Sequence, residues 1–106
     1  MITLSDIKRV AKEIGIAANA EQVILFGSHA RGEAHAESDV DLLIIADSHE
    51  PRFKRARKLY KLFSPYPFGM DLLVYTPEEV EAGKQIPLSF VSSILHEGMV
   101  VYDRRT

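Results

Sequence analysis

Two aspartates, Asp39 and Asp41, stand at the start of an apolar run within the stretch FGSHARGEAHAESDVDLLI, residues 26–44. Two carboxylates ~4 Å apart repel by roughly 4 kcal/mol at an effective dielectric near 20, a large share of the ~5–15 kcal/mol that stabilises a domain. A divalent cation relieves this repulsion, and Mg²⁺ binds through one or two carboxylates together with substrate phosphates. The pair therefore predicts cation-dependent phosphate chemistry at the start of a strand.

The residues that would complete such a site lie before and after the pair. Gly27 allows the backbone to approach a phosphate closely, and Ser28 offers a hydroxyl and an N–H at the start of a helical turn. Asp71 begins a later apolar run, MDLLVY. Parallel strands begin at the same edge of a sheet and alternate their side chains between its faces, so we expect Asp71 to lie beside Asp39 and Asp41.

Four short apolar runs predict the strands that position these residues, at 22–26, 39–46, 70–75 and 99–102. The second run is apolar on both faces beyond its start, which predicts a central strand covered on both sides. A helical segment joins the second run to the third, so these strands should be parallel with a right-handed crossover. The short connection between the first two runs predicts an antiparallel pair.

Helical spacing of apolar residues predicts the elements that cover the sheet. A first helix begins near Leu4 and is expected to end at Gly15. Thr76 and Glu79 predict a capping box, with Pro77 at the first helical position. A further helix is expected at 87–97, ended by Gly98, with an apolar side formed by Phe90, Val91, Ile94 and Leu95.

The segment 52–63 predicts one helix with two different faces. Its apolar stripe consists of Phe53, Ala56, Leu59, Tyr60 and Phe63. Its basic face consists of Arg52, Lys54, Arg55, Arg57, Lys58 and Lys61. Such a face is most often simply solvated, and the other interpretation is a surface for the nucleotide, RNA or an acidic partner. The aromatic residues Tyr60, Phe63 and Tyr66 are interpreted as core and loop packing, with base stacking as the alternative.

The 106 residues are expected to form a single domain, 1–106, of the α/β (α+β) class, with a small mixed sheet and helices on its faces. No cysteine is present, which excludes disulfides and thiolate metal sites. A net charge of -2 argues against nucleic-acid binding through bulk charge. The chain lacks both a signal peptide and an apolar stretch of the ~20 residues that a membrane helix needs, so we expect a cytoplasmic protein without membrane contact.

The stretch GSHARGEAHAESDVDLL resembles the signature of the minimal nucleotidyltransferases of the DNA polymerase β superfamily. Gly27, Ser28, Asp39 and Asp41 match its Gly-Ser turn and Asp-x-Asp pair, and Asp71 in GMDLLVYTPEEV fits the third acidic position. The final stretch SSILHEGMVVYDR also resembles the end of such domains, so the likeness covers nearly the whole chain. It implies the nucleotidyltransferase fold.

The resemblance also implies a mechanism. Asp39 and Asp41 would hold two Mg²⁺ ions, and Asp71 would complete one metal site and help to deprotonate the attacking hydroxyl. Gly27 and Ser28 would hold the triphosphate of ATP while AMP is transferred to an acceptor hydroxyl.

Two residues near this signature have an open role. Arg31 is a candidate for nucleotide binding, with a surface salt bridge as the equal alternative. His29 lies inside the signature and is expected to border the site at most. None of the four histidines, at positions 29, 35, 49 and 96, shows metal-ligand spacing, so we interpret them as surface or loop residues.

Members of this family of similar size act with an all-helical HEPN protein. The resemblance therefore implies an antitoxin that adenylylates a tyrosine of a HEPN RNase toxin and forms a hetero-oligomer with it. The alternatives are an antitoxin that neutralises its partner by binding alone, and a nucleotidyltransferase that acts on RNA or on a small molecule such as an aminoglycoside.

Overall fold

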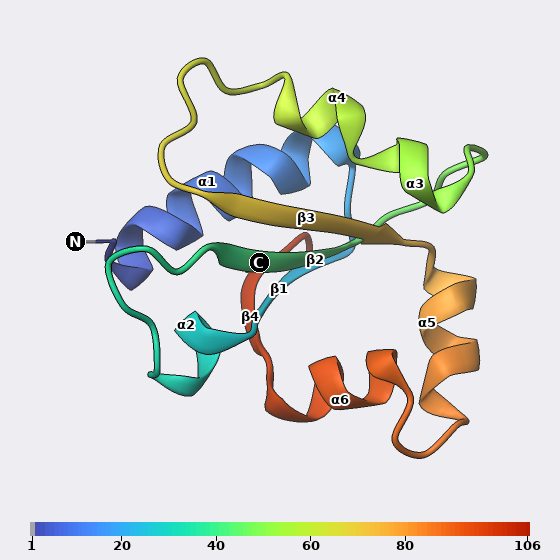
Figure 1. Cartoon of the computed structure of the whole chain (residues 1–106). Coiled ribbons are helices and arrows are strands. Elements are labelled where there is room, and N and C mark those ends of the chain that lie inside the picture. The colour runs from blue at the N-terminus through green and yellow to red at the C-terminus, as the bar shows by residue number, and fades with distance from the viewer. Residues whose placement is uncertain (1) are drawn as a thin grey trace.

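The computed structural model describes residues 2–106 and contains a four-stranded sheet with helices on both faces (Figure 1). The strands are β1 (Gln22–Phe26), β2 (Val40–Ile45), β3 (Met70–Tyr75) and β4 (Met99–Asp103), in the order β3-β2-β1-β4. β1 pairs antiparallel with β2 and with β4, whereas β2 and β3 pair in parallel. The predicted class, the interior place of the second strand and both predicted pairings are confirmed.

Helices flank this sheet on its two faces. α1 (Leu4–Ala18) and α4 (Arg57–Tyr60) cover one face, and α5 (Pro77–Lys84) and α6 (Phe90–Glu97) cover the other (Figure 1). No helix within residues 2–106 combines the length and the apolar character that crossing a bilayer requires. Two further short helices are α2 (Ser28–Arg31) and α3 (Arg52–Arg55).

The central strand β2 supplies side chains to two separate cores, because its residues alternate between the faces of the sheet. Leu42 and Ile44 are fully buried beneath α1 and α4. Leu43 is fully buried on the opposite face, beneath Val91 and Ile94 of α6. A fully buried side chain of this size contributes about 1.5–3 kcal/mol to folding, so β2 is anchored on both faces and holds its first residues in place.

The first helix continues past Gly15, and the prediction that it ends there is wrong. Asn19 ends it instead, in a left-handed conformation (φ 51°), and its N–H donates to the carbonyl groups of Gly15 and Ile16. Gly15 has a packing role, because a Cβ at this position would overlap the ring of Tyr102 on β4. The glycine therefore lets α1 approach the sheet closely.

The single helix predicted for 52–63 is two short helices, α3 and α4, joined at Ala56. The N–H groups of Lys54 and Leu59 donate to the carbonyl groups three residues earlier, those of Pro51 and Ala56. The backbone therefore makes tighter turns than a regular α-helix on both sides of Ala56. The inward residue of α3 is Arg55, whose side chain is only 10% exposed. The prediction that Phe53 faces the core is wrong: this residue is 75% exposed.

Side chains from these two helices cover the free edge of β3. The Leu72 N–H donates to the Tyr60 hydroxyl at 2.9 Å, and that hydroxyl lies 3.4 Å from the Met70 carbonyl. The Arg55 guanidinium donates to the Val74 carbonyl at 3.2 Å. Exposed edge strands pair readily with other chains, so these contacts protect β3 and fix its start. The packing interpretation of Tyr60 is confirmed.

The capping box predicted for α5 is confirmed: the Glu79 N–H donates to the Thr76 hydroxyl, and the Thr76 N–H donates to the Glu79 carboxylate. α6 begins at Phe90, three residues later than predicted, because the Ser89 side chain accepts the Ser92 N–H and so caps the helix there. Val91 and Ile94 are buried as predicted, but Phe90 is 52% exposed.

Candidate active site

Three neighbouring strands place Phe26, Asp41 and Asp71 in one row across the sheet. Phe26 on β1 is the register partner of Asp41 on β2, and Asp41 is the register partner of Asp71 on β3. Register partners in a sheet direct their side chains to the same face. The two aspartates therefore lie side by side on the face that carries α5 and α6, as the sequence predicts.

Asp39 reaches the same edge from the residues that precede β2. The Val40 N–H donates to the Gly69 carbonyl at 2.9 Å, which fixes the chain at the point where β2 and β3 begin. The Asp39 carboxylate lies over Gly69 so closely that a Cβ at position 69 would overlap Oδ1. The sequence analysis does not identify Gly69 as part of the site, although its position directly before the strand that carries Asp71 indicates it.

The Gly-Ser turn lies against the carboxylates. Gly27 has φ 77°, a conformation that favours glycine, and a Cβ there would overlap the Asp41 carboxylate. The Gly27 carbonyl accepts the N–H groups of Ala30 and Arg31, so the chain turns directly from β1 into α2. Ser28 is the first residue of α2. The structure thus brings all five signature residues, Gly27, Ser28, Asp39, Asp41 and Asp71, to one edge of the sheet.

Asp41 is the electrostatic centre of this group. Its side chain is half-buried, whereas Asp39 and Asp71 are exposed. Burial raises the pKa of Asp41 above its ordinary value, and the negative charges of Asp71 and Asp39 raise it further. The positive charges of His29 and Arg31 act in the opposite direction on this pKa. The site therefore carries an excess of negative charge that a cation would neutralise.

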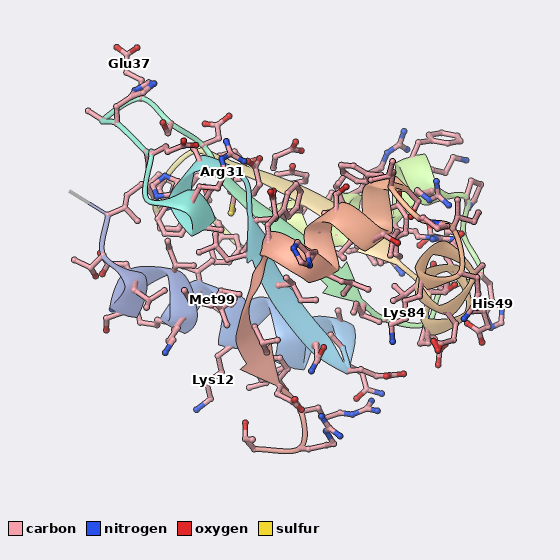
Figure 2. All side chains as sticks on the ribbon, turned by 90° about the horizontal axis from the view of Figure 1, so that it is seen from below. Lys12, Arg31, Glu37, His49, Lys84 and Met99 are labelled. Carbon is pink, nitrogen blue, oxygen red and sulfur yellow. The ribbon has the colours of Figure 1, made fainter. Side chains whose placement is uncertain are left out.

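Arg31, the candidate phosphate ligand, pairs with carboxylates within the chain. Its guanidinium contacts Glu33 at 2.5 Å and Glu97 of α6 at 3.5 Å. The salt-bridge alternative is therefore realised in this structure, while the nucleotide role stays a prediction. Figure 2 shows Arg31 at the same end of the molecule as Glu37, opposite the end that carries Lys84 and His49.

His29 connects α2 to the entry of β2. Its Nε2 lies 3.2 Å from the Ser38 carbonyl, next to Asp39, and its charge acts on the Asp41 carboxylate. The side chain thus borders the carboxylate group, as the sequence suggested, and helps to hold the turn against it.

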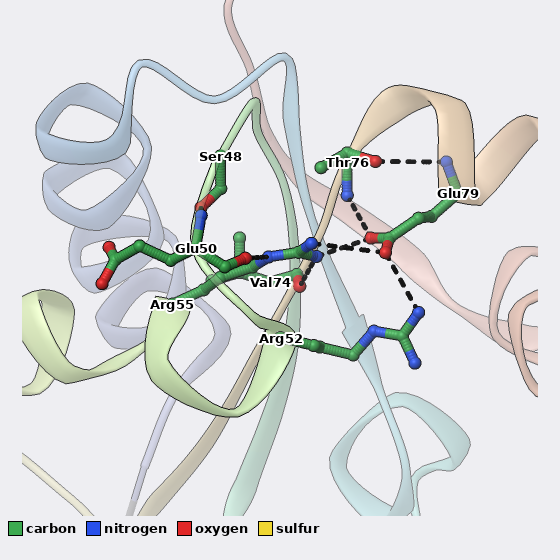
Figure 3. A network of polar contacts seen from close by, with 7 residues as sticks. All are labelled: Ser48, Glu50, Arg52, Arg55, Val74, Thr76 and Glu79. Carbon is green, nitrogen blue, oxygen red and sulfur yellow. Dashed lines mark hydrogen bonds and ion pairs between the residues drawn. The ribbon is translucent and has the colours of Figure 1, made fainter.

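The basic segment after β2 is partly used inside the protein. Arg55 and Arg52 both bind Glu79 at the start of α5, at 2.6 and 3.1 Å, and Arg55 also donates to the Glu50 carbonyl (Figure 3). The pKa of Glu79 is lowered to about 2, first by the hydrogen bond from Arg55 and further by those from the Thr76 N–H and Arg52. The prediction of a wholly solvated basic face is therefore wrong for Arg55, which joins the segment to β3 and α5.

The donor atoms of the carboxylate group suit Mg²⁺. Within residues 2–106, no group of three or more His, Asp or Glu side chains is arranged to hold a metal ion alone. Mg²⁺ usually binds through one or two carboxylates together with water and substrate phosphates. The neighbouring Asp41 and Asp71, with Asp39 nearby, are a donor set of that kind.

A separate hollow is lined in part by His29. It has a volume of about 620 Å³ and lies between the start of α1 and the loops around Ala34 and Phe68. None of the three aspartates lines it. The candidate site is therefore separate from this hollow, and two of its three aspartates, Asp39 and Asp71, are exposed.

Residues 4–102 match the family described as nucleotidyltransferase domain. This chain belongs to that family. A relative from Methanocaldococcus jannaschii, named "Putative protein adenylyltransferase MJ0141", is 35% identical over 97 residues, which cover 90% of this chain and 94% of the relative. The protein is accordingly a nucleotidyltransferase.

Solved structures share the fold of this nucleotidyltransferase. A crystal structure described as a putative nucleotidyltransferase from Sulfolobus solfataricus has a TM-score of 0.67 at 20% identity, covering 97% of this chain and 82% of that one. A crystal structure of a toxin-antitoxin with AMP-PNP has a TM-score of 0.58 at 18% identity, covering 92% and 74%. At these identities the likeness shows the fold alone, and it confirms the predicted nucleotidyltransferase fold.

Proposed function

We propose that this nucleotidyltransferase transfers AMP from ATP to a hydroxyl group of a partner protein, with Mg²⁺ as cofactor. The observation that carries the proposal is the row of Asp41 and Asp71 on adjacent parallel strands, directly beside the Gly27 turn. The name of the relative from Methanocaldococcus jannaschii supports AMP as the transferred group and a protein as acceptor.

Each residue of the group has a distinct role in this proposal. Asp39 and Asp41 hold two Mg²⁺ ions, and Asp71 completes one of these sites. Gly27, Ser28 and Arg31 bind the triphosphate, for which Arg31 exchanges its present carboxylate partners. Bound Mg²⁺ supplies positive charge that stabilises the triphosphate and the departing pyrophosphate.

The transfer is a single displacement at the α-phosphorus of ATP. The acceptor oxygen forms a bond to this phosphorus, and the bond between the phosphorus and the oxygen that leads to the β-phosphate breaks. Pyrophosphate leaves with that oxygen. The proton of the acceptor hydroxyl passes to the carboxylate of Asp71, which lies beside Asp41 on the neighbouring strand.

The partner in this proposal is a HEPN RNase toxin, and the acceptor is one of its tyrosines. The nucleotidyltransferase then acts in the cytoplasm as the antitoxin and forms a hetero-oligomer with the toxin. The structural neighbour that is described as a toxin-antitoxin with AMP-PNP supports both a protein partner and nucleotide binding.

Intact-mass spectrometry of the partner tests the proposal. The HEPN protein is incubated with the nucleotidyltransferase, ATP and Mg²⁺, and we expect AMP adducts that are absent with Asp39→Ala and Asp41→Ala. A partner that is inhibited but unmodified would establish neutralisation by binding alone. Labelled ATP offered with RNA or an aminoglycoside would reveal transfer to those acceptors instead.

A further inference from the structure

The backbone groups of Asp71 face the interior of the sheet, although β3 is an edge strand. Alternate residues of a strand direct their N–H and C=O groups to opposite edges of that strand. The Val40 N–H donates to the Gly69 carbonyl at 2.9 Å, and the Ala46 N–H donates to the Tyr75 carbonyl at 3.0 Å. The odd-numbered residues of β3, Asp71 among them, therefore face β2, and the even-numbered residues face the free edge.

The hydroxyl of Tyr60 occupies the free edge beside Asp71. It accepts the Leu72 N–H at 2.9 Å, and it donates to the Met70 carbonyl at 3.4 Å. One of the peptide units that flank Asp71 contains the Met70 carbonyl, and the other contains the Leu72 N–H. Each of these peptide units thus faces β2 on one side and is held by the same hydroxyl on the other.

We propose that Tyr60 is a positioning residue of the reaction, whose hydroxyl fixes the backbone on both sides of Asp71 and so keeps this carboxylate beside Asp41. The inference rests on the proposed function, in which Asp71 completes one metal site and receives the proton of the acceptor. Peptide units are planar, so fixing the two units that flank a residue fixes its φ and ψ and the direction of its Cβ. Without the hydroxyl, β2 alone holds this part of the edge strand.

Tyr60 is itself held in place by contacts that do not involve its hydroxyl. It is the last residue of α4, and its N–H donates to the Ala56 carbonyl at 3.1 Å. Its side chain packs against the core beneath α1 and α4, and its ring centroid lies 6.0 Å from that of Tyr66. Tyr60→Phe therefore removes the contact with β3 and keeps the packing of the ring.

A second side chain on the same edge shows that the contact is local. Arg55 donates to the Val74 carbonyl at 3.2 Å, and this carbonyl lies three residues beyond Asp71. Arg55 therefore holds the end of β3 next to α5, whereas Tyr60 holds the start of the strand. Loss of the Tyr60 hydroxyl should loosen the backbone around Asp71 and leave the end of β3 unchanged.

Backbone NMR of the metal-free protein tests this positioning directly. Tyr60→Phe should lower the order parameters of the Asp71 and Leu72 amides from the ~0.85 of a rigid strand and speed hydrogen exchange of the Leu72 N–H by roughly tenfold. The Val74 amide should not change. Tyr66→Phe is the matched control, because the Tyr66 hydroxyl forms no hydrogen bond within residues 2–106. Unchanged order parameters in Tyr60→Phe, or equal losses in Tyr66→Phe, overturn the proposal.

Binding of Mn²⁺ shows whether this position of Asp71 matters for the site. Mn²⁺ is titrated by electron paramagnetic resonance in the presence of α,β-methylene ATP, which cannot release pyrophosphate. Tyr60→Phe should weaken binding of one Mn²⁺ ion by about fivefold, which corresponds to ~1 kcal/mol, and leave the second unchanged, because Asp71 contributes to one metal site only. Asp71→Asn should weaken the same ion more strongly. Equal weakening of both ions would indicate a general loosening of the fold and would overturn the proposal, as would wild-type affinity for both.

Kinetics of AMP transfer separate this inference from the proposed function. Tyr60→Phe should lower kcat by about fivefold and leave the KM for the partner protein unchanged, because Asp71 acts in the chemical step. If AMP is transferred and Tyr60→Phe changes neither kcat nor the order parameter of Asp71, the function stands and the positioning role is wrong. If no AMP is transferred and no Mn²⁺ binds while the order parameters fall as expected, the function is wrong and Tyr60 still fixes the backbone around Asp71.

Discussion

Asp41 lies against Gly27 so closely that a Cβ at position 27 would overlap the Asp41 carboxylate in its present position. The contact joins the turn after β1 to the half-buried carboxylate of β2, and it determines where a phosphate bound at the turn would lie relative to that carboxylate. Two constraints therefore favour glycine at position 27: the positive φ of 77°, and the space that the Asp41 carboxylate occupies.

Gly27→Ala should affect both stability and nucleotide binding. The strained backbone alone, at φ 77° and ψ -156°, costs about 1–3 kcal/mol in the free energy of unfolding, and the new Cβ also displaces the Asp41 carboxylate. We expect at least a tenfold weaker Kd for Mg²⁺-ATP by calorimetry. Gly32→Ala is the control, because Gly32 has φ 73° with nothing within 4 Å of the added Cβ. Gly32→Ala should lose about 1–2 kcal/mol in urea unfolding, the cost of a left-handed α conformation, and keep the Kd of the wild type. Equal losses of affinity in the two variants would contradict the role of the contact.

Asp41→Asn should stabilise the nucleotide-free protein while it abolishes transfer. The pKa of Asp41 is raised, first by burial and then by Asp71 and Asp39, so its ionised form is disfavoured in the folded state. Asparagine carries no charge, so the variant loses a repulsion of ~1 kcal/mol between this carboxylate and its neighbours, and Tm should rise by about 4 °C at pH 7. Because the folded pKa is raised, the gain should shrink as the pH falls and vanish below the ordinary pKa of 3.8. Melting curves at pH 7 and 3.5 check this, and a lower Tm for the variant at pH 7 would contradict it.

The sequence predicts the strands and the carboxylate row because these depend on strong local signals. The apolar run of β2 needs cover on both faces, and the crossover to β3 requires parallel pairing, which places Asp71 beside Asp41. The capping box of Thr76 and Glu79 is equally local. Each of these features follows from residues close together in the chain or from a topological rule.

The features that the sequence does not predict depend on contacts between distant segments. Gly15 resembles a helix end, but its role is set by Tyr102, which is far away in the chain. Arg55 resembles a solvated cation in the sequence, but in the fold it donates hydrogen bonds to the Glu79 carboxylate and to the Val74 carbonyl at the edge of β3. The position of Phe90 depends on two rings from other strands, so its exposure cannot be derived from helical spacing.

Mg²⁺ together with ATP should raise the melting temperature of the wild type and not that of Asp39→Ala. A ligand at a hundredfold excess over its Kd stabilises the folded state by ~2.7 kcal/mol. The control is Asp47→Ala, an exposed aspartate that follows the other end of β2, and it should respond as the wild type does. Differential scanning fluorimetry gives the measurement. A wild type without a shift would count against the phosphate site, and a full shift in Asp39→Ala would count against Asp39 as a metal ligand.

Glu79 should make the stability of the protein depend on pH in the acid range. Its pKa falls from 4.5 to about 2, chiefly because Arg55 donates to it. A lowered carboxylate pKa stabilises the fold above the unfolded value, and that stabilisation is lost as the pH falls from 4.5 through about 2. The side chain is 28% exposed, so solvent screening reduces the contribution to about 1–2 kcal/mol.

Glu79→Gln should therefore destabilise the protein by about 1–2 kcal/mol at pH 7 and by progressively less toward pH 2, measured by urea unfolding across that range. The matched control is Glu78→Gln, which alters the exposed neighbour in the first turn of α5 and should leave the pH profile unchanged. Loss of the Glu79 carboxylate should also release Arg52 and Arg55 from this ion pair, which holds the 52–55 segment against β3 and α5 (Figure 3). If Glu79→Gln is equally destabilised at pH 2 and pH 7, packing of the side chain rather than its charge stabilises this junction.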